Sequence, residues 1–136
     1  MKIVIVGAGA MGCLFAATLS KAKEEILLLD KNQQRADKIN QQGLIVEGIT
    51  NFKAQVKATA DPKVIDRADL VILSVKSYQT KEAITLAKPL IKDSTVVLTL
   101  QNGIGNLEII SEIIGEDKVI GGVTNQGATL IDAGHI

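Results

Sequence analysis

KIVIVGAGAMG, residues 2–12, is the stretch that decides the fold of this chain. Its first part, Lys2–Val6, is a short β-branched run of the kind found in strands that are buried on both faces. Apolar residues then recur at helical spacing, at Met11, Leu14, Phe15, Leu19 and Ala22. The period changes from strand to helix across three glycines, which predicts a strand, a tight turn and a helix.

The glycines form a G-x-G-x-x-G pattern, which on its own occurs often by chance. Here the pattern follows a strand, opens an amphipathic helix and has an acidic residue, Asp30, 18 positions beyond Gly12. In that context Gly7 permits the turn, Gly9 lets a pyrophosphate approach the backbone, and Gly12 lets the helix pack close to the strand. We therefore predict that residues 7–12 bind the pyrophosphate of a dinucleotide.

The residues after the second apolar strand bear on the choice of cofactor. The carboxylate of Asp30 would accept hydrogen bonds from the ribose hydroxyls of the adenosine, which favours NAD(H) over a cofactor with a 2′-phosphate. Lys31 and Arg35 follow closely, and a guanidinium matches the geometry of a phosphate. If Asp30 turned away, these two cations would clamp NADP(H). The sequence leaves the choice between NAD(H) and NADP(H) open.

The rest of the chain continues the alternation of strands and helices. Strands are predicted at 2–6, 25–30, 69–75, 94–100 and 118–124, and helices from 11, over 33–42, from 77 to about 86 and over 107–114. Two short strands, 44–49 and 52–58, interrupt this order. The alternation predicts an α/β, doubly wound, mostly parallel sheet of the Rossmann type with helices on both faces. Such folds bind ligands at the carboxyl ends of the strands.

Composition argues against several classes of function. The chain has 15 lysine plus arginine and 15 aspartate plus glutamate residues, so no net field draws it to nucleic acid or to an anionic membrane. Aromatic residues make up only 2%, which leaves few platforms for base stacking. One cysteine and one histidine offer neither an internal disulfide nor a metal cluster, and a cytoplasmic setting fits best. Cys13 is expected to be a buried filler and His135 a surface strand residue.

Polar residues follow two further strands, where the nicotinamide end of a dinucleotide would lie. Lys76 comes directly after the strand that ends at Val75, and Asn102 follows the strand that ends at Leu100, within the turn QNG. Taken singly, a lysine at a strand end is usually a solubilising charge, and an asparagine before glycine is usually a turn residue. Together with the rest of the sequence, however, they form a recognisable pattern.

The chain resembles the amino-terminal domain of the ketopantoate reductase (2-dehydropantoate 2-reductase) family over its whole length. The resemblance includes the GAGAMG loop, the two short strands between 44 and 58, VKSYQT, the QNG turn and GGVTNQGATL. It implies an oxidoreductase that reduces the ketone of the keto acid 2-dehydropantoate by hydride transfer, usually from NADPH, in pantothenate and coenzyme A biosynthesis. Asp30 stands where the family more often has arginine, which puts the usual NADPH preference in doubt.

The resemblance also assigns roles to single residues. It implies that Lys76 and Asn102 contact the cofactor, that Asn102 also binds the substrate, and that the backbone at Ala128 lies beside the cofactor. Gln79 is a weaker candidate of the same kind. The full set expected to bind the cofactor is Gly7, Ala8, Gly9, Ala10, Met11, Gly12, Asp30, Lys31, Lys76, Asn102 and Ala128.

The resemblance further implies that residues 1–136 are one dinucleotide-binding domain without its last strands and without the helical carboxyl-terminal domain of the family. In the family that second domain supplies the lysine that acts as general acid. We therefore expect no catalytic residue in this chain and no activity from the chain alone; the composition already predicts that it holds no metal. A homodimer is a further expectation.

Two other classes share the predicted cofactor half. A stand-alone regulatory NAD(H)-sensing domain would need nothing at the nicotinamide end, so the two-strand insert and the QNG turn favour the reductase. Another β-hydroxyacid-type dehydrogenase would differ only in the second domain.

Overall fold

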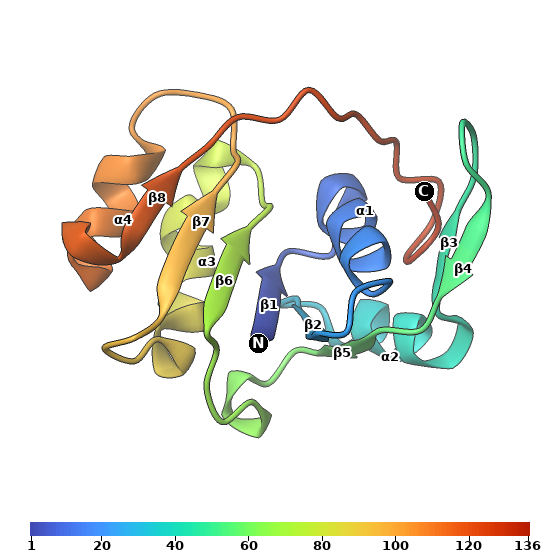
Figure 1. The fold of residues 1–136 in the computed structure, drawn as a ribbon, viewed down its shortest axis with the longest axis horizontal. Coiled ribbons are helices and arrows are strands. Elements are labelled where there is room, and N and C mark those ends of the chain that lie inside the picture. Colours follow the sequence, from blue (N-terminus) through green and yellow to red (C-terminus); the bar gives the residue numbers. More distant parts are fainter.

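The computed structural model describes residues 1–136 and contains a six-stranded sheet (Figure 1). Its strands are β1 Lys2–Val6, β2 Glu25–Leu29, β5 Lys57–Thr59, β6 Leu70–Leu73, β7 Val96–Thr99 and β8 Val119–Gly121. They lie in the order β5-β2-β1-β6-β7-β8, and every neighbouring pair is parallel. The winding reverses between β1 and β6, so the predicted doubly wound fold is confirmed.

Four helices cover the two faces of the sheet. They are α1 Ala10–Leu19, α2 Gln33–Gln42, α3 Thr80–Ala87 and α4 Asn106–Ile114. The first two pack in one hydrophobic core and the last two in another. Alternate residues of β1 fill these cores, because Ile3 and Ile5 belong to the first, and Val4 and Val6 to the second. The β-branched run at the start of the chain is therefore buried on both faces, as predicted.

Most predicted boundaries lie within a few residues of the observed ones. The helix α2 has the predicted bounds and ends at Gly43, whose φ of 76° suits glycine. The predicted helix from 77 begins with a 3-10 turn, Ser77–Gln79, before α3. The strands β6 and β7 end before the predicted limits, because the residues that follow them leave the sheet and line a groove.

The predicted two-strand insert is present as an antiparallel hairpin, β3 Leu44–Val46 and β4 Phe52–Ala54. The prediction that residues 52–58 form one strand is wrong. The chain leaves the hairpin after Ala54 and forms β5, which pairs with β2 at the edge of the large sheet. Asn40 of α2 holds β5 in place, since its side chain exchanges two hydrogen bonds of 2.8 Å with the backbone of Ala58.

The carboxyl-terminal segment, residues 122–136, runs from β8 across the carboxyl ends of the strands to the hairpin (Figure 1). The prediction of a strand as far as residue 124 is therefore wrong, since β8 ends at Gly121. The segment finishes beside β3, where the amide of Ile136 donates to Ile45 at 2.9 Å. His135 forms a bridge with Ile45, and its side chain is only 25% exposed, with Nε2 3.2 Å from Glu47 Oε2. It is not the surface residue that the sequence predicted.

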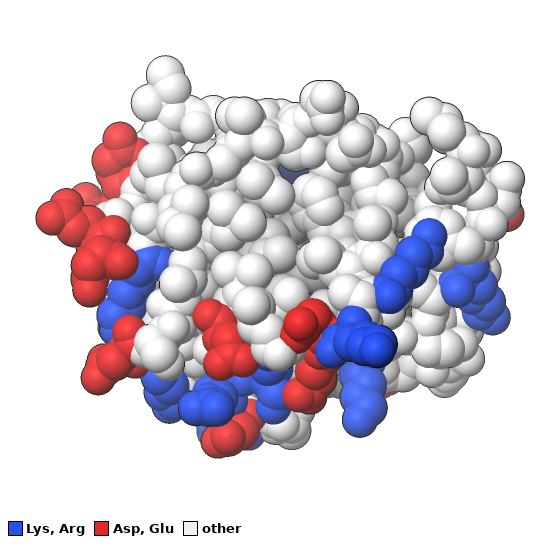
Figure 2. Space-filling model, in the orientation of Figure 1, with Lys and Arg blue, Asp and Glu red and all other residues white.

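Charged side chains lie mainly along the lower and outer margins of the face shown in Figure 2. Every helix is too short or too polar to span a bilayer.

Candidate dinucleotide-binding site

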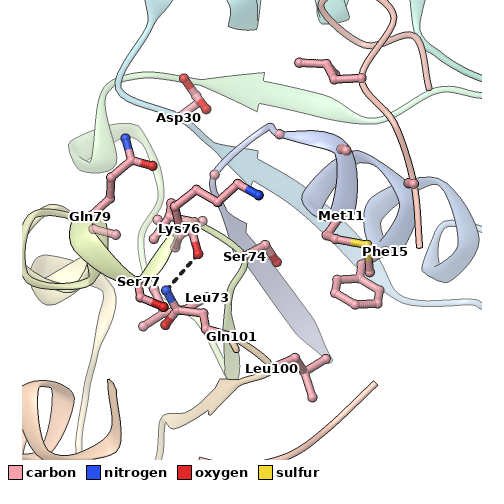
Figure 3. Close-up of a pocket in the computed structure, with 18 of the residues that line it drawn as sticks. Met11, Phe15, Asp30, Leu73, Ser74, Lys76, Ser77, Gln79, Leu100 and Gln101 are labelled. Carbon is pink, nitrogen blue, oxygen red and sulfur yellow. Dashed lines mark hydrogen bonds between the residues drawn. The ribbon is translucent and has the colours of Figure 1, made fainter. Parts of the chain in front are cut away.

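A groove of about 610 Å³ lies at the carboxyl ends of the strands (Figure 3). Its walls come from the turn after β1, from the residues that follow β2, β6 and β7, and from the carboxyl-terminal segment. The groove extends over β1 and β6, between which the winding of the sheet reverses. This is where open parallel sheets bind their ligands.

Four consecutive amides at the start of α1 have no hydrogen-bond acceptor in the chain, those of Gly9, Ala10, Met11 and Gly12. The first bonded amide of this turn is that of Cys13, which donates to the Gly9 carbonyl at 2.9 Å. The amides lie at the amino terminus of a ten-residue helix, where the backbone carries partial positive charge. A phosphate group would satisfy these amides without any basic side chain. The loop therefore fits a pyrophosphate.

The three glycines of the loop have different surroundings. A Cβ at Gly7, where φ is 100°, would lie 2.6 Å from Val75 Cγ1. A Cβ at Gly12 would lie 1.8 Å from the carbonyl oxygen of Gly7, so only glycine lets α1 come this close to the turn. A Cβ at Gly9 would meet nothing within 4 Å. The open space at Gly9 is where the sequence predicts the close approach of a phosphate.

Asp30 is a structural residue of the loop as well as a lining residue. It is only 4% exposed, and its Oδ2 accepts the Ala8 amide at 2.7 Å while Oδ1 accepts the Asn32 amide at 2.9 Å. Arg35 Nη1 donates to both oxygens, at 3.0 and 3.2 Å. These bonds fill the acceptor positions of the carboxylate, so ribose hydroxyls would have to displace one of them. This internal network could not be predicted from the residue pattern around Asp30.

The same network explains the position of Ala8. Its amide points to Asp30 and its side chain is fully buried, so it does not line the groove. Gly12 is also buried behind the loop. Of the predicted loop residues, the groove exposes Gly7, Gly9, Ala10 and Met11.

Two basic residues lie at the end of the groove next to β2. Lys31 Nζ is 2.9 Å from Glu82 Oε2 of α3, so an ion pair connects the two walls of the groove. Arg35 is held on Asp30 and is one-third exposed. Both predicted candidates for a 2′-phosphate therefore line the groove, and each already has a carboxylate partner.

Lys76 and Asn102 lie on neighbouring loops after β6 and β7, and both line the groove. Lys76 is exposed and forms no ion pair. Gln101 joins the two loops, because its Nε2 donates to the Val75 carbonyl at 2.8 Å (Figure 3) and to Thr80 Oγ1 at 2.9 Å. Thr80 Oγ1 in turn bonds to the buried Asn106, at 2.8 Å. This polar network fixes Lys76 and Asn102 relative to each other.

Ala128 lies in the carboxyl-terminal segment, which forms the wall of the groove opposite the loops. Gln79 also lines the groove. The structure thus brings residues from five separate parts of the chain to one cavity, as the sequence predicted for most of them.

Sequence reasoning missed several lining residues. Ser74, at the end of β6, has a buried Oγ without a hydrogen-bond partner, and it lies in the groove wall close to Gly12. Glu82 was missed because, in the sequence, it looks like an ordinary solvent-facing charge beside Lys81 on an amphipathic helix. The apolar part of the wall was missed as well, since such side chains look like core in a sequence: Phe15, Leu73, Leu86, Leu100 and Leu130.

The remaining candidate residues lie away from this chemistry. Cys13 is fully buried in the core, as predicted, and burial raises the pKa of its thiol to about 11. The thiol is therefore protonated at neutral pH and a poor nucleophile. No cluster of three or more His, Cys, Asp or Glu side chains is placed to hold a metal ion.

Rossmann-type dinucleotide-binding domains hold a pyrophosphate at a helix amino terminus whose amides are unpaired. That terminus lies at the switch point of a doubly wound sheet, as it does here. Fold and groove assign the chain to that class. Residues 3–136 match the family described as ketopantoate reductase PanE/ApbA, and the chain belongs to that family. The resemblance noted in the sequence is confirmed.

The relatives agree with this family. The 2-dehydropantoate 2-reductase of Pyrococcus horikoshii is 44% identical over 136 residues, and that of Archaeoglobus fulgidus is 38% identical over 136 residues. The match covers 100% and 99% of this chain but only 44% and 43% of those proteins. The chain thus spans less than half the length of these relatives.

Solved structures show the same fold. D-mandelate dehydrogenase in complex with NADH and anilino(oxo)acetate matches with a TM-score of 0.91 and 33% identity, over 99% of this chain and 44% of that one. A PanE/ApbA family ketopantoate reductase from Ralstonia eutropha matches with a TM-score of 0.89 and 34% identity, over 99% and 45%.

Proposed function

We propose that this chain is the cofactor-binding half of an NAD(P)-dependent oxidoreductase that reduces 2-dehydropantoate to pantoate. The observation that carries the proposal is the row of amides without acceptors at Gly9, Ala10 and Met11, which line the groove, in a chain that belongs to the ketopantoate reductase family. The regulatory NAD(H)-sensing alternative is not favoured. The proposed domain organisation, the homodimer and the cytoplasmic location remain predictions.

The proposed cofactor site follows the groove from one end to the other. The amides of Gly9, Ala10 and Met11, which line the groove, bind the pyrophosphate, while Gly7 shapes the turn, Gly12 lets α1 pack against it and Asp30 fixes the loop through Ala8. Lys31 lies at the adenosine end, because it follows β2, where this fold places the ribose. Lys76, Asn102 and the backbone at Ala128 lie toward the nicotinamide.

When bound, the nicotinamide supplies the hydride that reduces a ketone. The contribution of this chain is to hold the ring and the substrate in one geometry and to exclude water from between them. Asn102 is proposed to donate its carboxamide N–H to the substrate. The Gln101 and Thr80 network would support that role, since it fixes the loop on which Asn102 lies.

NADH is proposed as the preferred cofactor. Asp30 does not offer free oxygens to the ribose, so the preference cannot come from that hydrogen bond alone. It comes instead from the absence of an unpaired cation for a 2′-phosphate, because Arg35 is paired with Asp30 and Lys31 with Glu82. The solved D-mandelate dehydrogenase with bound NADH supports this choice for a relative of the same fold.

That neighbour also supports a second candidate, another 2-hydroxyacid dehydrogenase, because its TM-score is as high as that of the reductases. The two candidates share the cofactor half and differ in the keto acid. Assays of a full-length family member that carries these 136 residues, with 2-dehydropantoate and with phenylglyoxylate, would separate them.

The isolated chain is expected to bind NADH but to reduce 2-dehydropantoate at least about 100-fold more slowly than a full-length family member. General acid catalysis contributes roughly 10²- to 10⁴-fold, and its donor in the family is a lysine outside the matched part. Calorimetry measures the binding, and the loss of NADH absorbance measures turnover. Turnover close to that of the full-length protein would show that an acid lies within the chain, with Lys76 the first residue to test.

A further inference from the structure

We infer that Glu82 is a specificity-determining residue that selects against a cofactor with a 2′-phosphate. The inference rests on the proposed function, and it concerns the adenosine end of the groove. Glu82 lies in the first turn of α3, and its carboxylate meets Lys31 Nζ with both oxygens, at 2.9 and 3.2 Å.

The charges at this end of the groove are balanced one to one. Two cations, Lys31 and Arg35, face two carboxylates, Glu82 and Asp30, with ion-pair distances of 2.9 Å and 3.0 Å. A 2′-phosphate carries about two negative charges near neutral pH. It would find no unpaired cation here, whereas a 2′-hydroxyl requires none.

The two ion pairs differ in how easily they open. Asp30 is buried and accepts two backbone amides, so its pair with Arg35 is part of the fold. Glu82 is 59% exposed at the side chain, and Lys31 is its only hydrogen-bond partner. Lys31 likewise has no other partner. The pair between Lys31 and Glu82 is therefore the one that a ligand can replace.

Glu82 opposes a 2′-phosphate in two ways. It holds the lysine that would otherwise pair with the phosphate, and its own charge repels the phosphate across the groove. At a partly solvated site each effect is modest, so together they correspond to about fivefold to tenfold in affinity. NADH, which lacks the phosphate, is affected by neither.

The test is calorimetric titration of the chain with NADH and with NADPH, comparing wild type with Glu82→Gln. The variant removes the charge and keeps the size of the side chain. We expect NADPH affinity to rise about fivefold to tenfold, with NADH affinity within about twofold of wild type. Glu112→Gln is the matched control, because Glu112 is exposed on α4, has no ion pair and lies outside the groove.

A second variant assigns the effect to the ion pair. Lys31→Gln in the Glu82→Gln background should remove most of the gain in NADPH affinity, because the gain depends on the released lysine. An unchanged ratio of NADPH to NADH affinity in Glu82→Gln would overturn the inference and leave the proposed function intact. An equal rise for both cofactors, or the same rise in Glu112→Gln, would also overturn it. If wild type bound neither dinucleotide, the proposed function would fail first.

Discussion

Replacement of Gly9 by valine is expected to abolish dinucleotide binding and to leave the free energy of unfolding nearly unchanged. Gly9 has φ −79° and ψ −170°, a conformation open to any residue, and a Cβ there meets nothing within 4 Å. The fold therefore tolerates the side chain. The isopropyl group would fill the space in front of the open amides of α1, where the pyrophosphate is proposed to lie.

The expected loss is at least about 100-fold in affinity. A hydrogen bond to a charged group contributes roughly 1.5–3 kcal/mol, and the valine would prevent two or more of them. Calorimetry with NADH measures the affinity, and thermal unfolding shows that the variant is folded. If a folded Gly9→Val protein bound NADH as tightly as wild type, the loop would not be part of the cofactor site.

Replacement of Gly12 by alanine is expected to act on stability, in contrast to Gly9→Val. We expect the free energy of unfolding to fall by about 3 kcal/mol. The new Cβ would lie 1.8 Å from the Gly7 carbonyl oxygen and 3.0 Å from its carbon. Both are backbone atoms of the turn, so relief requires α1 to move away from β1. The effect is measured by urea denaturation.

Gly127→Ala is the matched control for that measurement. Gly127 has no neighbour within 4 Å of an added Cβ and no positive φ, so this variant should change the unfolding free energy by less than about 0.5 kcal/mol. Equal stability of Gly12→Ala and wild type would contradict the proposed packing role of this glycine.

Periodicity and glycine spacing were sufficient to predict the sheet, its helices and the loop at Gly9. These signals are local, since each depends on residues that are close together in the chain. The split of residues 52–58 into β4 and β5 was not predictable in this way. It depends on which partner strand each half finds, and the partners, β3 and β2, belong to different sheets.

In the candidate site, too, features with a local sequence signal were predicted and features that depend on distant partners were not. The positions of Lys76 and Asn102 followed from the rule that strand ends share one edge of a parallel sheet. The sequence predicted that Asp30 lies at the groove but not that it is bonded within the chain. A sequence does not show that a carboxylate already accepts hydrogen bonds from Ala8 and Arg35. The pairing of Lys31 with Glu82 joins residues 51 positions apart and has no local signal.

The central claim is that the groove at the start of α1 binds a nicotinamide dinucleotide, and amide chemical shifts test it most directly. On titration of the ¹⁵N-labelled chain with NADH, we expect saturable shifts of the amides of Gly9 to Gly12 and of Lys76 and Asn102. The amide of Ile49, in the turn of the β3–β4 hairpin and outside the groove, should not shift. No saturable shift at Gly9 to Gly12, or shifts confined to the hairpin, would contradict the claim.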